Sequence, residues 1–320
     1  MSWSSAAAFY NQLGVMLRAG LTIPQAIEHA GRSASGFHAQ HAAAWSSGCA
    51  AGRSFAEQLA ADGEEPIARA LTMAGEQSGH LPEMVKEIAS FNEHRMELRR
   101  MIIGRLIYPM LLINVALLMP GVVKWFVKDG SLIGLFLPLI LFWGFVVAAA
   151  ISLYITRHSG LGARLALLPL VRTITGPLVA ANTCLVLHAT TTAGMLHHRG
   201  LELAADGCGN RAMAARLRHA ATELMTGRIP TFTAACATCD LPRTMLQLIE
   251  AGEVSGSLES NLGRAAALAR ESFRERTMWA ARIFTGLIYG LAMLLAVMAI
   301  MSVASSYLGQ VNEAANSIDN

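Results

Sequence analysis

The sequence predicts an all-α membrane protein that has two homologous cytoplasmic helical-bundle domains and three transmembrane helices. Three observations lead to this fold class: few charged residues, three long apolar stretches and a short motif that occurs twice. Only 15% of the 320 residues are charged and 53% are hydrophobic, whereas about a quarter of the residues of a soluble domain are charged. This composition indicates membrane segments before any part of the chain is examined separately.

Three uncharged apolar stretches divide the chain, and a helix needs about 20 such residues to cross a bilayer. The stretches run from about Leu106 to Val123, from Ser131 to Ile155 and from Ile283 to Tyr307. The predicted order is a cytoplasmic helical domain (1–100), a first transmembrane helix (101–123), a short periplasmic loop (124–130), a second transmembrane helix (131–156), a second cytoplasmic helical domain (157–282), a third transmembrane helix (283–307) and a periplasmic tail (308–320).

Basic side chains set the expected orientation of these helices. Cytoplasmic flanks of transmembrane helices carry an excess of lysine and arginine. Such residues cluster before the first stretch, after the second and before the third: Arg95, Arg99, Arg100, Arg105, Arg157, Arg164, Arg172, Arg264, Arg270, Arg274, Arg276 and Arg282. The first ten residues do not resemble a signal peptide. We therefore expect a multi-pass protein of the bacterial inner membrane, with a cytoplasmic N-terminus and a periplasmic C-terminus.

A short motif occurs once in each soluble segment. Gly75-Glu76-Gln77-Ser78-Gly79 matches Gly252-Glu253-Val254-Ser255-Gly256, and each copy precedes a helical pattern of apolar residues. The candidate site residues are Gly75, Glu76, Ser78, Gly79, Gly252, Glu253, Ser255 and Gly256. In a structural interpretation, Gly75 and Gly252 end one helix in the left-handed conformation. The next helix is then capped by Ser78 or the residues after it in the first copy, and by Ser255 or Ser257 in the second.

The motif glutamates are not needed for such a turn. Glu76 and Glu253 could make a buried hydrogen bond, bind a cation or contact a partner protein. A helix–turn–helix corner accounts for every other residue of the motif. The sequence alone leaves a structural and a functional role open for the two glutamates.

The sequence contains no recognisable catalytic or cofactor motif. It lacks GxxxxGK[ST], HExxH and GxSxG, and its five cysteines include one CxxC, Cys236 to Cys239, without the second pair of a zinc ribbon. We expect ordinary reduced thiols, no metal, no cofactor and no catalytic residue, so the protein is not predicted to be an enzyme. The net charge of +3 is too small to indicate a nucleic-acid partner.

The two motif copies, each followed by a basic segment and an apolar stretch, resemble the type II secretion system F domain family. The resemblance extends over about residues 5–310. It implies an inner-membrane platform protein of a type IV pilus or type II secretion machine, and the short N-terminal segment favours a short pilus-type member. The implied partners are a cytoplasmic hexameric assembly ATPase, pilin or pseudopilin transmembrane helices, other inner-membrane alignment proteins, membrane lipid and further copies of the chain.

Other interpretations remain at this point. A type II secretion platform is the nearest alternative, a transport permease is a more distant one, and a sensor or scaffold would require the repeat to be coincidental. No charged residue lies in the middle of an apolar stretch, which argues against an ion-coupled permease. Residues 1–100 carry eight basic and ten acidic residues, and residues 157–282 carry fourteen and nine. We therefore expect the first domain to meet the ATPase and the second to contribute to self-association and membrane contact.

Overall fold

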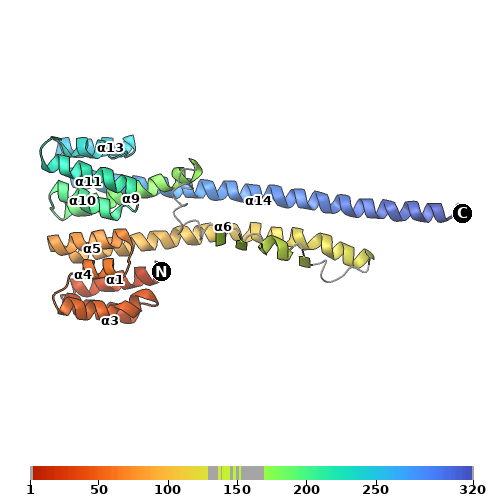
Figure 1. The fold of residues 1–320 in the computed structure, drawn as a ribbon, viewed down its shortest axis with the longest axis horizontal. Coiled ribbons are helices and arrows are strands. Elements are labelled where there is room, and N and C mark those ends of the chain that lie inside the picture. Colours follow the sequence, from red (N-terminus) through yellow and green to blue (C-terminus); the bar gives the residue numbers. More distant parts are fainter. Residues whose placement is uncertain are drawn as a thin grey trace. The chain divides into compact units, whose positions relative to one another are not determined.

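The computed structural model describes residues 3–128, 136–137, 139–144, 147–148, 151–152 and 169–318. Every element in these residues is a helix, so the predicted all-α class is confirmed (Figure 1). The second predicted transmembrane helix, 131–156, lies largely outside the described residues.

The first half of the chain, up to Lys128, contains six helices in its described residues. They are α1 (Trp3–Arg18), α2 (Ile23–Ser33), α3 (Phe37–Ala50), α4 (Phe55–Ala61), α5 (Pro66–Ser78) and α6 (Leu81–Lys128). Capping side chains and a proline explain where several of these helices begin. Thr22 forms a capping box with Gln25 before α2, and the Ser54 side chain accepts a hydrogen bond from the Glu57 N–H at α4. Pro66 opens α5, where a missing N–H costs nothing.

The second described half also contains six helices. They are α9 (Pro169–Thr192), α10 (His197–Gly207), α11 (Arg211–Met225), α12 (Phe232–Ala237), α13 (Arg243–Ser255) and α14 (Leu258–Ile318). Asn210 caps α11 and Thr231 caps α12 through their side chains. From α10 to α14, the order of short and long helices repeats that from α2 to α6.

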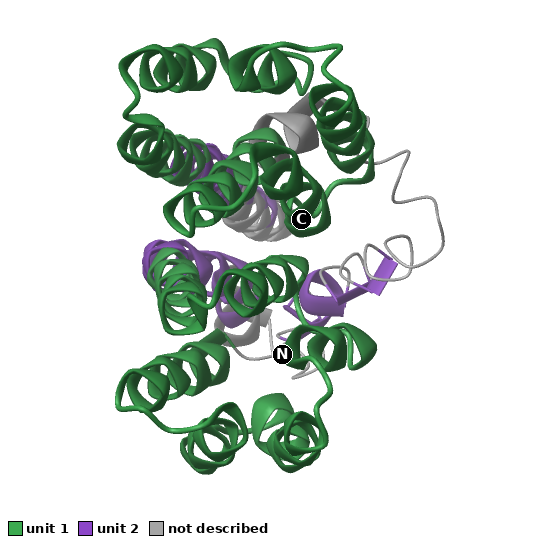
Figure 2. Cartoon of the chain, turned by 90° about the vertical axis from the view of Figure 1, so that its left-hand side faces the viewer, with its two compact units in different colours: residues 1–99, 173–276 green, residues 100–172, 277–320 purple. Residues whose placement is uncertain are grey.

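The described soluble segments form one compact unit, made of residues 1–99 and 173–276, and residues 100–172 and 277–320 form the other (Figure 2). In the first unit a single hydrophobic core runs through both halves. Helix α5 of the first half packs against α10 of the second (Figure 1). This contact is close because Gly207 has no side chain: a Cβ there would lie 3.0 Å from the Ala70 Cβ. The two predicted cytoplasmic domains are thus parts of one packed body.

The two halves contribute different side chains to this core. In the first half, the fully buried rings of Phe9, Tyr10, Trp45 and Phe55 pack edge to face, an arrangement that aromatic rings favour. The buried side chains of the second half are mainly aliphatic, and they include four thiols, those of Cys184, Cys208, Cys236 and Cys239. All five cysteines of the chain are free thiols.

Burial predicts the reactivity of these thiols. It raises the pKa of the Cys184 thiol to about 12 and raises the pKa of Cys236 well above its ordinary value. A maleimide added to the folded full-length chain should therefore label Cys49, which is partly exposed, and leave the four buried cysteines unmodified until denaturant is added. Mass spectrometry of labelled peptides measures this, and rapid native labelling of Cys236 or Cys239 would contradict it.

Two of the described helices are long and apolar enough to cross a membrane. They are α6, over Leu81–Met119, and α14, over Leu258–Met298. In their most apolar stretches only 17% and 6% of the residues are buried, unlike the core helix of a soluble protein. These two helices cover the first and third predicted transmembrane segments.

Within the second unit, a small cluster joins α6 and α14. Ile113 and Leu117 of α6 pack with Ala292 of α14. The rings of Tyr108 and Tyr289 lie 6.2 Å apart, centre to centre. The contact between the tyrosines involves the Leu-Ile-Tyr sequence that occurs near the start of the first and third apolar stretches.

The ends of both long helices differ from expectation. Residues 124–128, which the sequence assigns to a periplasmic loop, continue α6 as helix to Lys128. Neither Pro nor Gly interrupts 122–128, so the sequence offers no signal to end the helix there. The predicted tail after residue 307 is likewise helical as far as Ile318.

Candidate functional site

Each copy of the motif forms a sharp corner between two helices. The last glycine of each copy, Gly79 or Gly256, has a left-handed backbone, with φ of 77° and 68°, and ends α5 or α13. The prediction that Gly75 and Gly252 adopt this conformation is wrong, because both lie inside their helices. The residue after the serine makes the turn, as is usual for a glycine that follows the last helical residue.

The first glycine of the motif has a different purpose. A Cβ on Gly75 would lie 2.8 Å from the Cα of Leu81, and a Cβ on Gly252 would lie 3.0 Å from the Cα of Leu258. Both distances involve backbone atoms that begin the next helix. The absent side chain therefore lets α6 cross closely over α5, and α14 over α13.

Ser78 and Ser255 do not cap the following helices, whereas Ser257, the other predicted candidate, lies directly before α14 and its hydroxyl accepts a hydrogen bond from the Asn261 side chain at 2.9 Å. Ser78 Oγ donates a hydrogen bond to the Ala74 carbonyl at 2.7 Å, and Ser255 Oγ donates to the Ala251 carbonyl at 2.6 Å. Both serines lie in the last turn of their own helix, where a hydroxyl can bond back to the carbonyl four residues earlier. The structure thus places all eight predicted residues at the two corners, with different roles for the glycines and serines.

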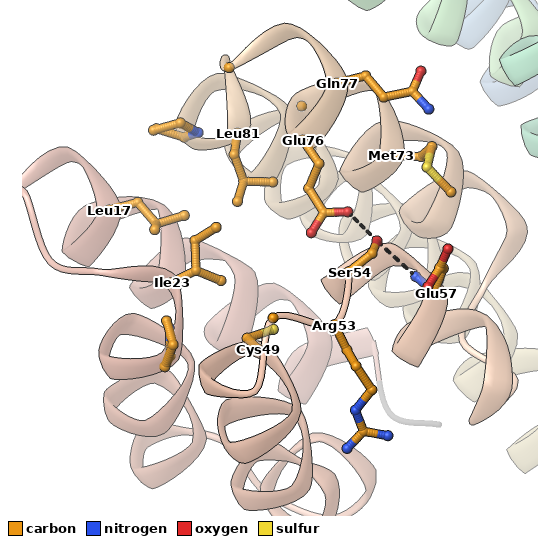
Figure 3. Close-up of a pocket in the computed structure, with 15 residues that line it drawn as sticks. Leu17, Ile23, Cys49, Arg53, Ser54, Glu57, Met73, Glu76, Gln77 and Leu81 are labelled. Carbon is orange, nitrogen blue, oxygen red and sulfur yellow. Dashed lines mark hydrogen bonds between the residues drawn. The ribbon is translucent and has the colours of Figure 1, made fainter.

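Glu76 caps the start of a neighbouring helix. Its carboxylate accepts hydrogen bonds from the backbone N–H groups of Phe55, at 2.7 Å, and Ala56, at 3.2 Å. It also accepts one from the Ser54 hydroxyl at 2.5 Å (Figure 3). The first N–H groups of a helix have no partner within the helix and attract negative charge. Glu76 accepts hydrogen bonds from two of these N–H groups at the start of α4.

Glu253 does the same in the second half. Its carboxylate accepts hydrogen bonds from the N–H groups of Phe232, at 2.7 Å, and Thr233, at 2.8 Å, which are the first two residues of α12. Of the three roles open from the sequence, the structure shows the hydrogen bond for both glutamates. Sequence reasoning missed the residues on the other side of the contact. The Ser54-x-x-Glu57 pattern of a helix start was the available signal for α4.

The contacts of Glu253 change its acidity. Burial alone would raise the pKa of this carboxyl, but hydrogen bonds from Thr233 and Phe232 and the nearby His197 lower it more, so the pKa lies below its ordinary value of 4.5. A group whose pKa is depressed by folding adds stability above its unfolded pKa, and the addition is lost as the pH falls through the folded pKa.

The lowered pKa of Glu253 predicts how the stability of a variant depends on pH. At pH 7 the Glu253→Gln variant of the full-length chain should unfold at a lower temperature than the parent protein. The difference should shrink as the pH falls below 4.5 and the parent carboxylate is itself protonated. Thermal unfolding in detergent at several pH values measures it. A difference that persists unchanged at pH 3 would show that the charge of Glu253 is not what stabilises the cap.

A groove opens beside the corner of the first half. It encloses about 770 Å³, and Glu76 lies in its wall. Its labelled lining includes the apolar side chains of Leu17, Ile23, Met73 and Leu81 and the polar ones of Arg53, Ser54, Glu57 and Gln77 (Figure 3). The groove thus combines an apolar wall with the end of α4 that Glu76 caps. Among the described residues, no group of three or more His, Cys, Asp and Glu side chains is placed to hold a metal ion.

These features define an α-helical protein with two membrane-spanning candidates, each of which begins at a corner whose glutamate caps a neighbouring helix. The chain belongs to the family described as Type II secretion system (T2SS), protein F, whose model matches residues 9–127 and 183–308. The family resemblance predicted from the sequence is confirmed.

Three relatives carry the name Type II secretion system protein F. The one from Aeromonas hydrophila is 26% identical over 316 residues, which cover 90% of this chain and 81% of the relative. The one from Pseudomonas aeruginosa is 28% identical over 224 residues, covering 62% and 55%. The one from Vibrio cholerae is 26% identical over 247 residues, covering 69% and 61%. The matched part therefore ranges from about half to four-fifths of these relatives.

Proposed function

We propose that this chain is the inner-membrane platform protein of a type IV pilus assembly machine, and that it couples a cytoplasmic assembly ATPase to the extraction and polymerisation of pilin. The platform of a type II secretion system is the second candidate, favoured by the names of the relatives. The observation that carries the proposal is that each motif corner begins one uninterrupted helix that continues into an apolar stretch.

These two helices are suited to passing on a movement. The helix α6 has 48 residues and α14 has 61. At 1.5 Å per residue, about 30 Å of helix separates Leu81 from Met101, and about 38 Å separates Leu258 from Ile283. A push on a corner would reach the membrane through a continuous hydrogen-bonded rod. No covalent chemistry by the chain is required.

We also propose that the two halves are copies of one unit and that the chain crosses the membrane three times. The two matches to one family model, the common helix order and the two glutamate caps support the duplication. Since both long helices leave a soluble segment in the same direction along the chain, a further crossing over 131–156 is needed to return it. The arginine distribution then puts the N-terminus in the cytoplasm and the C-terminus in the periplasm.

Within this scheme the first half meets the ATPase, and the second contributes to self-association and membrane contact. The groove beside Glu76 supports this assignment, since it offers apolar walls to a partner. At the corresponding position of the second half the residue is charged: Glu250 stands three residues before Glu253, whereas the apolar Met73 stands three before Glu76. The eight motif residues are candidate partner contacts because they shape the two corners.

A pair of photo-crosslinking residues tests the assignment. We expect a crosslinker at Met73 in the full-length chain to capture the cognate ATPase in cells, and one at Glu250 to capture it much less. Both positions lie three residues before their motif glutamate, so each serves as the control for the other. Capture from Glu250 alone would reverse the assignment.

Deletion of the gene tests the function itself. Surface pili are imaged and secreted proteins are profiled in the same deletion strain. Loss of pili with secretion intact is the expected result, and loss of secretion with pili intact moves the chain to a secretion machine. If both are normal and a solute-uptake defect appears, the platform function is wrong and a permease replaces it.

A further inference from the structure

The segment that follows α4 is anchored by polar contacts. The indole N–H of Trp45 donates a hydrogen bond to Asp62 at 2.7 Å. The Nε2 atom of His38 lies 3.2 Å from a carboxylate oxygen of Glu64, and the two side chains are only 1% and 3% exposed. Glu65, next along the chain, pairs with Arg95 of α6. Three of the four residues from 62 to 65 are thus acidic, and their contacts attach the segment after α4 to α3 and α6.

The matching segment of the second half is anchored in another way. Counted back from the motif glutamate, the place of Asp62 is taken by Cys239 and that of Glu64 by Leu241. Cys239 is fully buried and Leu241 is 5% exposed. The charged residue between them, Asp240, pairs with Arg216 at an exposed position. The end of α12 is therefore held chiefly by apolar burial.

The polar anchor of the first half is incompletely satisfied. His38 Nε2 and the Glu64 oxygen that faces it at 3.2 Å have only each other, and the Tyr10 hydroxyl and His38 Nδ1 are buried without a hydrogen-bond partner among the described residues. The rings of Tyr10 and His38 lie 5.6 Å apart, so these atoms form one cluster. Buried polar groups without partners raise the free energy of the folded state, and contact with water removes that penalty. Apolar anchors have no comparable gain on exposure.

We propose that residues 55–65, made of α4 and the segment after it, form a latched flap that opens locally while the rest of the first half stays folded. The Glu76 cap holds the N-terminal end of the flap, and the cluster of His38 and Glu64 is the latch at the other end. Opening moves a wall of the groove, because Glu57 of α4 lines it. This property concerns the chain alone and does not depend on which machine it serves.

Hydrogen exchange of the full-length chain in detergent, followed by mass spectrometry, tests the flap. The amides of residues 55–65 should exchange at least about tenfold faster than those of residues 232–242, since local opening sets the exchange rate. The double variant His38→Met with Glu64→Leu supplies apolar contacts like those of the second half. It should slow exchange in 55–65 and leave 232–242 unchanged. The matched control, Asp240→Asn, removes an exposed ion pair and should alter neither segment.

Equal exchange of the two segments in the parent protein would overturn the proposal, whatever the variants do. Slowed exchange in the double variant supports a latch that is poised to open. Faster exchange there would show that His38 and Glu64 are a simple structural staple, and the flap would be rejected. The comparison within the parent protein decides the matter if the double variant does not fold.

Discussion

Proline at position 275 of α14 should abolish appendage assembly while leaving the chain in the membrane. Glu275 is exposed and lies between the last core residue of the first unit, Ala269, and the predicted membrane segment. Proline inside a helix removes one hydrogen bond, clashes with the preceding turn and costs about 3 kcal/mol. The corner and the membrane segment would each remain intact, but the rod between them would bend.

A proline in the other long helix and two alanine variants serve as the comparison and the controls for this experiment. Glu97→Pro interrupts α6 at an exposed position near Met101, where the first predicted membrane segment begins. The variants Glu97→Ala and Glu275→Ala remove the same charges but keep the helix, and they should assemble normally. Appendages are counted by microscopy, and membrane fractionation shows that each variant is inserted. Normal assembly by an inserted proline variant would exclude rigid coupling through that helix.

Removal of the two caps should give the next largest effect. Glu76→Ala leaves the first N–H groups of α4 without an acceptor, and Glu253→Ala does the same to α12. Each loss is expected to cost about 1–2 kcal/mol of unfolding free energy, the usual value of a helix cap. The two sites share no partner, so the costs in the double variant should add. Thermal unfolding of the full-length chain measures the stability.

The same variants separate a structural from a functional role of the glutamates. We expect impaired assembly with normal membrane insertion in both single alanine variants. Gln77→Ala, next to Glu76 in the same groove, is the matched control for stability. If Glu76→Gln restores stability without restoring assembly, the charge of Glu76 also serves a partner. Normal assembly in both single variants and in the double variant would leave the glutamates with the cap alone.

Periodicity and composition were sufficient for the helical class. The apolar spacing after each motif, such as Leu81, Val85 and Ile88, reflects one buried helix face, and the structure buries all three. Helix ends were harder to predict. Between the predicted end at residue 123 and Lys128 no breaking residue occurs, and at Gly75 a glycine that resembles a helix stop lies inside α5 because α6 packs on it. Glycine serves both turns and close packing, and only the neighbours of a position show which applies.

The sequence by itself determined the all-α class, the family, the location of the motif corners and the two long apolar helices, because these depend on composition and on spacing along one helix. Only the tertiary structure decided that both soluble segments share one core, that Glu76 and Glu253 cap α4 and α12, and that His38 meets Glu64. Each of these contacts joins residues about 20 or more positions apart. No local periodicity records such pairings, since they arise from how the helices pack against one another.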